Sequence, residues 1–314
     1  MLDKIRSAIA RTLSMALATV CILLEESNGQ NAFSPCDKSE IETLVMDFGI
    51  NAERKHHFGY KADVKLEQHG FTDPRESGTT TWDVLWFEDR KSKSKRQDVL
   101  TVLPNPTDTS YWVVATTHKG KFNVSMGDRT IYNKSVPSIG LAPIAEDPWM
   151  APISEPRLVE RGKAGRPGYW ADLLSMDKLL WCESNGRLVR GEWTLGEGKY
   201  KTYVQVYFDS AKDGMPVLTR FVIPTDYEKR FAKFGKRYSC EIKTKWLKEG
   251  DIYMPLLVET AIENYSTKGV FRSTMDYSVE YTWKSKLVTE KGVDPTVFEH
   301  AKIPSEELSG MFDP

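Results

Sequence analysis

The chain has 314 residues, of which 43 are lysine or arginine and 44 are aspartate or glutamate, so its formal net charge at pH 7 is −1. A nearly neutral chain has no electrostatic attraction to nucleic acid or to an anionic membrane surface, and we expect neither as a partner. The length allows one large β domain or two smaller ones.

The beginning of the chain predicts an export signal. Three basic residues precede the uncharged apolar run 12–24, and two glutamates end it. At about 1.5 Å per residue this run spans roughly 20 Å as a helix, which is shorter than the roughly 30 Å hydrocarbon core of a bilayer. We therefore predict a signal peptide over residues 1–29, cleaved before Gln30 or after Ala32, and a periplasmic or secreted protein without a membrane span in its mature form. An N-terminal anchor that stays uncleaved is the alternative.

Residues 37–56 predict a helix near the start of the mature chain. Ile41, Leu44, Val45 and Phe48 recur there at the spacing of one helical face. This face is expected to pack against a sheet.

Period-two alternation dominates the remainder of the chain. Apolar and polar side chains alternate over residues 57–67, 240–246 and 274–284, and turn signals such as Asp213-Gly214 separate such stretches at hairpin spacing. Because successive side chains of a strand point to opposite faces, each stretch has one dry face and one wet face, which is typical of antiparallel sheets. We predict a mainly β fold, an antiparallel meander of roughly ten to twelve strands with a few covering helices.

A segment rich in proline and glycine at about residues 137–182 interrupts the meander. Its last part, residues 169–182, predicts a helix because leucines and a tryptophan supply the apolar positions. We interpret the segment as a loop and helix lying over one continuous sheet, so that residues 30–314 form a single β-rich domain. A linker between two sheets is the alternative.

Three cysteines remain after the predicted cleavage. Cys182 follows an apolar segment and Cys240 lies within a strand pattern, so these two are candidates for a disulfide in an oxidising compartment. Two separate buried thiols are the alternative.

No motif in the chain predicts catalysis, a metal or a cofactor. The five histidines lack zinc-ligand spacing. There is no G-x-S-x-G elbow, and the glycine-rich run 191–198 has neither Rossmann nor P-loop spacing. The basic run 90–96 reads as a solvated loop. We expect a protein that is not an enzyme and that uses no cofactor.

The aromatic residues lie largely within the predicted strands, where most are expected to fill the core. The strand at residues 82–87 is nevertheless apolar on both faces, so a helix covers its second face or that face lines a ligand cavity. The aromatic residues predicted to line an apolar cavity are Trp82, Trp86, Phe87, Trp246, Tyr281 and Trp283.

From residue 238 onward the chain resembles the periplasmic lipoprotein-carrier superfamily (LolA/LolB-like). The resemblance rests on a strand ending in Trp246, a short polar turn, a strand opening with Ile252-Tyr253-Met254-Pro255, a long alternating strand to Trp283, and a closing tail that includes residues 293–298 and Ile303-Pro304. It implies an incomplete (half) β-barrel that wraps around helices and encloses an apolar cavity for acyl chains.

The function expected from these features is extracytoplasmic binding of a lipid or of a lipoprotein acyl chain. The alternative is a secreted β-sandwich module that binds glycans or protein partners through exposed aromatic side chains.

Overall fold

The computed structural model describes residues 32–70, 77–102, 109–117, 120–125, 131–132, 144–160, 164–195, 202–222, 238–265, 271–283 and 286–299. The predicted signal peptide, residues 137–143 of the predicted insertion and the closing Ile303-Pro304 lie outside these residues. Within the described parts of the chain, no helix is long and apolar enough to cross a membrane.

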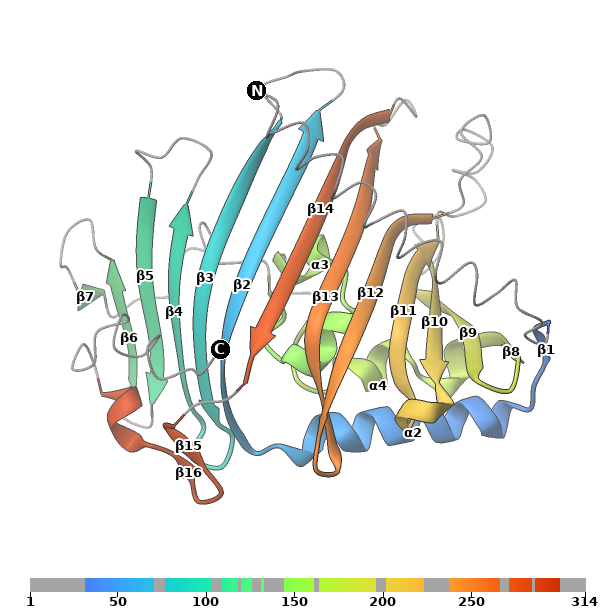
Figure 1. Cartoon of the computed structure of the whole chain (residues 1–314), viewed down its shortest axis with the longest axis horizontal. Coiled ribbons are helices and arrows are strands. Elements are labelled where there is room, and N and C mark those ends of the chain that lie inside the picture. Colours follow the sequence, from blue (N-terminus) through green and yellow to red (C-terminus); the bar gives the residue numbers. More distant parts are fainter. Residues whose placement is uncertain are drawn as a thin grey trace, which may run out of the picture.

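Fourteen strands of the described chain form one antiparallel sheet in the order β1-β8-β9-β10-β11-β12-β13-β14-β2-β3-β4-β5-β6-β7 (Figure 1). Strands β1 and β7 are its two edges and do not pair with each other, so the sheet stays open and the predicted mainly β fold is confirmed. The bounds are β1 Ser34–Pro35, β2 His57–Gly70, β3 Gly78–Asp89, β4 Ser94–Val102, β5 Thr109–Thr117, β6 Gly120–Ser125, β7 Ile131–Tyr132, β8 Leu179–Ser184, β9 Leu188–Leu195, β10 Thr202–Asp209, β11 Met215–Val222, β12 Tyr238–Glu249, β13 Ile252–Tyr265 and β14 Phe271–Thr282.

The strand count exceeds the expected ten to twelve because the edge strands β1 and β7 have only two residues each. Two residues are too few for an alternating pattern to be visible in the sequence. The long strands β2, β12 and β14 lie where the alternation predicted them.

One face of the sheet, which we call the inner face, carries the main core. Alternation and register bring together Tyr60 opposite Trp86, Ala62 opposite Tyr281, and Ile242 opposite Thr260. All of these side chains are buried. The opposite face is called the outer face below.

Helix α2 (Lys38–Arg54) packs along one end of the strands, as Figure 1 shows. Asp37 caps it by accepting a hydrogen bond from the Ser39 amide, 3.0 Å long. Ile41, Val45 and Phe48 are buried. The helix predicted over residues 37–56 is therefore confirmed.

The predicted insertion forms a set of short elements behind the sheet in Figure 1. They are η2 (Pro148–Ile153), α3 (Pro156–Glu160), α4 (Tyr169–Leu173) and η3 (Met176–Lys178). The helix predicted over residues 169–182 is wrong beyond Leu173, because Leu179–Ser184 is strand β8 and pairs with β9. A short apolar run fits a buried strand as well as a helix, and here pairing with β9 satisfies its backbone groups.

The outer face of β3 is covered by the C-terminal segment, residues 286–299. This segment contains β15 (Val288–Thr289), β16 (Gly292–Val293) and η7 (Pro295–Phe298). Its Val293, Val297 and Phe298 form a small second core with Leu85 and Phe87 of β3. The second apolar face of β3 is thus explained by a cover made of the chain's own C-terminal part.

The predicted disulfide between Cys182 and Cys240 is wrong. Neither residue is disulfide-bonded. Cys182 lies on β8 and Cys240 on β12, four strand spacings apart in the sheet order. Four spacings of about 4.8 Å give roughly 19 Å along the sheet, whereas a disulfide requires Cα atoms within roughly 7 Å.

Candidate functional site

Six aromatic side chains meet at the centre of the inner face, and we call them the aromatic cluster. The ring centroids of Trp149 and Trp283 are 5.3 Å apart, those of Tyr60 and Tyr281 are 5.2 Å apart, and the rings of Tyr60 and Trp86 are parallel within 4°. Its members are Phe58, Tyr60, Trp86, Trp149, Tyr281 and Trp283, all buried.

Four of the six predicted cavity residues lie on the inner face in or beside this cluster. Trp86, Tyr281 and Trp283 belong to it, and Trp82 is buried on the same face, four residues before Trp86 in β3. Trp246 is only half-buried and lies apart, against Phe48 of α2, with its indole N–H bound to the Pro216 carbonyl at 2.8 Å.

The assignment of Phe87 to the same cavity is wrong. Phe87 neighbours Trp86 in β3 and therefore points to the outer face, where it is fully buried under the C-terminal segment. Alternation within the strand already separated these two side chains, but it did not show that a different cover lies over each face.

The polar atoms of the cluster and of the neighbouring Trp82 are either hydrogen-bonded or buried without a partner. The Trp86 indole N–H is of the first kind and donates to Glu88 at 3.2 Å. The indole N–H groups of Trp149 and Trp283 donate to the carbonyls of Tyr253 and Pro255, at 2.7 and 2.6 Å. The hydroxyls of Tyr60 and Tyr281 and the indole N–H of Trp82 are buried without a hydrogen-bond partner in the described structure.

A buried polar group without a partner costs about 1–3 kcal/mol. Burial also raises the pKa of both Tyr60 and Tyr281, so that each hydroxyl keeps its proton and remains a donor. The inner face therefore presents hydrogen-bond donors in apolar surroundings.

Residues 144–160 and 164–178, called the cover below, lie over the inner face. Trp149 of the cover contacts Phe58 and Trp283 of the aromatic cluster and is 0% exposed. The elements of the cover are short: η2 has six residues and contains Pro152, and α3 and α4 have five each. Helices this short are not stable alone, so tertiary contacts hold the cover in place.

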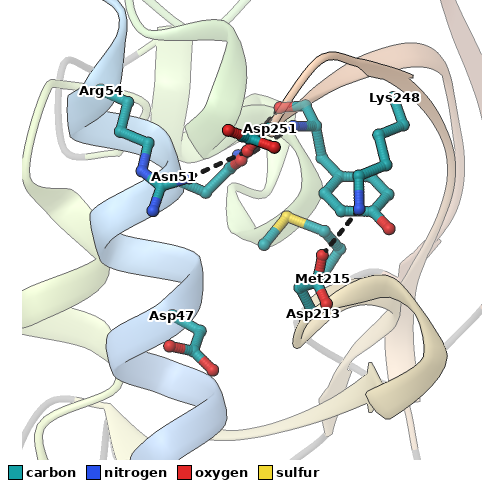
Figure 2. Close-up of a pocket in the computed structure, with 8 residues that line it drawn as sticks. Asp47, Asn51, Arg54, Asp213, Met215, Lys248 and Asp251 are labelled. Atoms are coloured by element: carbon teal, nitrogen blue, oxygen red, sulfur yellow. Dashed lines mark hydrogen bonds and ion pairs between the residues drawn. The ribbon is translucent and has the colours of Figure 1, made fainter.

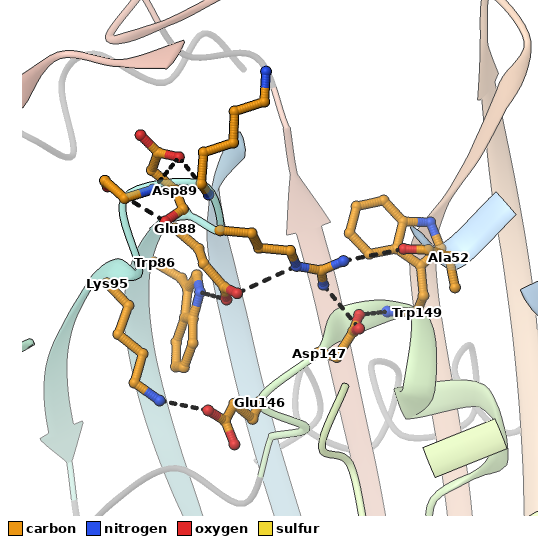
Figure 3. Close-up of polar contacts among 11 residues, drawn as sticks. Ala52, Trp86, Glu88, Asp89, Lys95, Glu146, Asp147 and Trp149 are labelled. Atoms are coloured by element: carbon orange, nitrogen blue, oxygen red, sulfur yellow. Dashed lines mark hydrogen bonds and ion pairs between the residues drawn. The ribbon is translucent and has the colours of Figure 1, made fainter. Parts of the chain in front are cut away.

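A buried cluster of charges joins the cover to the sheet, as Figure 3 shows. The Arg90 guanidinium donates to Asp147 of the cover at 2.8 Å, to Glu88 of β3 at 3.3 Å and to the Ala52 carbonyl of α2 at 3.3 Å. Its charged carbon also lies 5.2 Å from the centroid of Phe58. We call Glu88, Arg90 and Asp147 the Arg90 cluster.

Burial has the largest effect on the pKa values of the two carboxyl groups of this cluster. It raises the pKa of Asp147 to about 6, although Arg90 and the Trp149 amide both favour the charged carboxylate. Burial also raises the pKa of Glu88. The cover is thus attached through a carboxyl group that titrates near neutral pH.

Sequence reasoning missed the cover side of this site and misplaced part of the basic run. Of that run, Lys91 and Lys93 are exposed as expected, but Arg90 belongs to the Arg90 cluster and Arg96 is 2% exposed, which corrects the solvated-loop interpretation. A signal was present at Asp147, because an aspartate followed by proline is a common helix start.

A second, polar pocket of about 380 Å³ opens between α2 and the hairpins that follow β10 and β12 (Figure 2). Asn51 binds the backbone of Tyr253 through both its amide atoms at 2.8 Å, and Lys248 pairs with Asp213 at 3.1 Å. These contacts of Asn51 fasten α2 to the sheet, and the lining of the pocket is mostly polar, which suits a lipid poorly.

No family model matches the chain, and no curated protein matches it either. Among solved structures, a DUF1329 family protein from Desulfovibrio piger is 9% identical, with 86% of this chain and 100% of that chain covered and a TM-score of 0.40.

Two further structures are less similar. A beta-barrel-like protein of the domain of unknown function DUF1849 from Brucella abortus is 11% identical over 72% of this chain and 98% of that one, with a TM-score of 0.19. The MucA/MucB complex of Pseudomonas aeruginosa is 8% identical over 77% of this chain and 94% of that one, with a TM-score of 0.21. Similarities of this size assign neither a family nor a function.

Proposed function

We propose that the chain is an extracytoplasmic, non-catalytic binding protein for an apolar ligand, namely a lipid or the acyl chain of a lipoprotein, and that the ligand binds to the inner face. The observation that carries the proposal is the mismatch between the inner face and its cover. A surface that is mostly apolar and aromatic, with a few buried threonines, runs from β9 to β3. What lies over its centre is a set of short helical pieces, each too short to be stable alone.

The ligand takes the place of the cover in this proposal. Each methylene that an acyl chain buries contributes about 0.8 kcal/mol, so a long chain can compete with the buried side chains of the cover. The unpartnered hydroxyls of Tyr60 and Tyr281 suit the carbonyl oxygen of an ester or carboxyl group. Export, as the sequence of residues 1–29 predicts, supplies the compartment in which such a carrier acts.

The alternative of a module that binds glycans through exposed aromatics has less support. Among the aromatic side chains whose exposure the structure describes, none is exposed. Apart from the two-stranded sheet of β15 and β16, the described strands also form one open sheet, whereas a sandwich needs two packed sheets.

Binding of a fluorescent fatty acid tests the proposal, together with native mass spectrometry of the protein purified from its own envelope. We expect co-purified lipid and saturable binding. A protein that carries no lipid and binds no fatty acid overturns the proposal.

Competition between cover and ligand makes a second, sharper prediction. The apparent affinity falls in proportion to the fraction of molecules whose inner face is open. Trp149→Leu, which removes the hydrogen bond to Tyr253 but keeps an apolar side chain, should therefore bind the fatty acid several-fold more tightly than the wild type. Trp181→Leu on β8, outside the aromatic cluster, is the matched control and should bind like the wild type. Weaker binding by Trp149→Leu would show that the cover does not compete with the ligand.

A further inference from the structure

Two cysteines face each other at the β1 edge of the sheet, just before α2 begins. β1 pairs with β8 so that Pro35 is opposite Glu183, and the next pair in this register is Cys36 and Cys182. The Cys36 amide donates to the Cys182 carbonyl at 3.3 Å, and the Cys182 thiol donates to the Cys36 carbonyl at 3.2 Å.

This register places the two residues at a separation suited to a disulfide. Opposite residues of a hydrogen-bonded antiparallel pair have Cα atoms about 5.5 Å apart. Disulfides join residues whose Cα atoms are about 4.4–6.8 Å apart, most often about 5.5–6 Å. The two side chains also lie on the same face of the strand pair, because directly opposite residues project together.

The pair is open to a reagent from one side. Cys36 is half-buried and lines a hollow of about 510 Å³ together with Asp37, Ser184 and Gly186. Cys182 is buried behind it. Burial, with the adjacent Cys182 thiol, raises the pKa of Cys36 to about 12. The Cys36 thiol thus stays protonated until an oxidant engages it.

We propose that Cys36 and Cys182 form a disulfide when the chain meets a disulfide oxidant, such as oxidised glutathione or a thiol oxidoreductase. The more exposed Cys36 loses its proton, and its thiolate attacks the oxidant, forming a mixed disulfide and releasing one thiolate. The Cys182 thiol then loses its proton and its sulfur attacks the Cys36 sulfur, releasing the second thiolate. The two protons go to the released thiolates, so the two cysteines are oxidised and the oxidant becomes two thiols.

The bridge fastens a weakly held edge. β1 contains two residues and leads directly into α2. Cys36 and Cys182 are 146 positions apart in the sequence, so the bridge closes a long loop and restricts the unfolded chain strongly. Cys240 does not compete, because it lies on β12, four strand spacings from β8. The inference does not depend on the proposed ligand.

Peptide mapping of the full chain without reduction tests the bridge. After incubation with oxidised glutathione, we expect one cross-linked peptide that contains Cys36 and Cys182. Its thermal midpoint should exceed that of the reduced protein by roughly 5–15 °C. Cys240→Ser should keep both the cross-link and the shift.

Cys36→Ser is the complementary variant. It should lose both effects of oxidation while its reduced-state midpoint stays close to that of the reduced wild type, which shows that the fold is intact. Recovery of Cys36 and Cys182 as separate glutathione adducts or free thiols in the oxidised wild type overturns the proposal, as does a cross-link between any other pair of cysteines.

Discussion

The sheet is covered on both faces near β3, and the two covers are attached in different ways. Outside, Arg96 pairs with Asp98 of its own strand β4 at 2.7 and 2.8 Å and donates at 2.9 Å to the Val297 carbonyl of the C-terminal segment. Inside, Arg90 pairs with Asp147, which belongs to the cover itself. The outer ion pair is therefore complete within the sheet. The pair of Arg90 with Asp147 exists only while the cover is closed, although Arg90 also pairs with Glu88 of β3.

This difference indicates which of the two covers can be displaced from the sheet. Removing the outer segment leaves its ion pair intact, but it breaks the hydrogen bond from Arg96 to the Val297 carbonyl and exposes Phe87 and Leu85 to water. Releasing the inner cover lets Arg90 and Asp147 regain water, which offsets part of the cost, because burial already disfavours the charge of Asp147. We therefore regard the outer segment as a fixed part of the fold and the inner cover as the part that a ligand displaces.

The largest expected effect is on the outer side. Asp98→Ala removes the carboxylate from a guanidinium that is 2% exposed, which should lower the free energy of unfolding by about 3–5 kcal/mol in urea denaturation. The whole sheet should lose stability together, because β4 lies between β3 and β5. A loss under about 1 kcal/mol would mean that the outer ion pair is not a fixed part of the fold.

The next effect belongs to the inner cover and depends on pH. The pKa of Asp147 rises from 3.8 to about 6 on folding, so its contribution favours the fold below pH 4 and is lost as the pH rises through 6. Asp147→Asn mimics the neutral form. Wild type should therefore gain about 2–3 kcal/mol relative to this variant when the pH falls from 7 to 4.

The comparison with the variant at each pH cancels those titrating groups that do not interact with Asp147. Asp37 and Glu241, whose pKa values are lowered, are present in both proteins, whereas Glu88 interacts with Asp147 and its titration is part of the measured difference. If the unfolding free energies of the wild type and of Asp147→Asn differ by the same amount from pH 4 to 7, the attachment of the cover through the Arg90 cluster does not depend on pH.

A third, smaller effect is expected from two glycine-to-alanine substitutions, one under the outer segment and one under α2. A β-carbon at Gly59 would lie 2.6 Å from the Phe87 ring, and one at Gly191 would lie 2.4 Å from Ile41 of α2. Each alanine should cost about 1–3 kcal/mol through overpacking. Hydrogen exchange should quicken in residues 286–299 for Gly59→Ala and in α2 for Gly191→Ala. Equal changes in both regions would show that the outer segment and α2 are not independent of each other.

The sequence predicted the sheet well and the covers poorly, for a physical reason. Alternation identifies which residues share a face, so β2, β12 and β14 were recognised and Trp86, Tyr281 and Trp283 were correctly placed on one face. It carries no information about what lies over a face, and for that reason Phe87 was assigned to the wrong side.

The order of the strands in the sheet and the burial of charged side chains could not be predicted from the sequence either. Cys182 and Cys240 both lie in apolar surroundings, but only the order of the strands shows that they are far apart and that Cys36 is the neighbour of Cys182. Arg90 looked solvated because its partner Asp147 is 57 positions away. The sequence of the cover shows no helical alternation of polar and apolar residues, since Pro148–Ile153 is a six-residue 3-10 helix whose residues are all buried.

The smallest expected effect concerns the rim of the inner cover, where Lys95 of β4 pairs with Glu146 next to the Arg90 cluster (Figure 3). Both side chains are well exposed, at 39% and 45%, so water screens the pair and Glu146→Gln should change the free energy of unfolding by less than about 1 kcal/mol. Fatty-acid binding should also stay as in the wild type. If Glu146→Gln instead strengthened binding as much as Trp149→Leu, the cover would be held by charge at its rim rather than by its buried contacts, and the contrast between the two covers would fail.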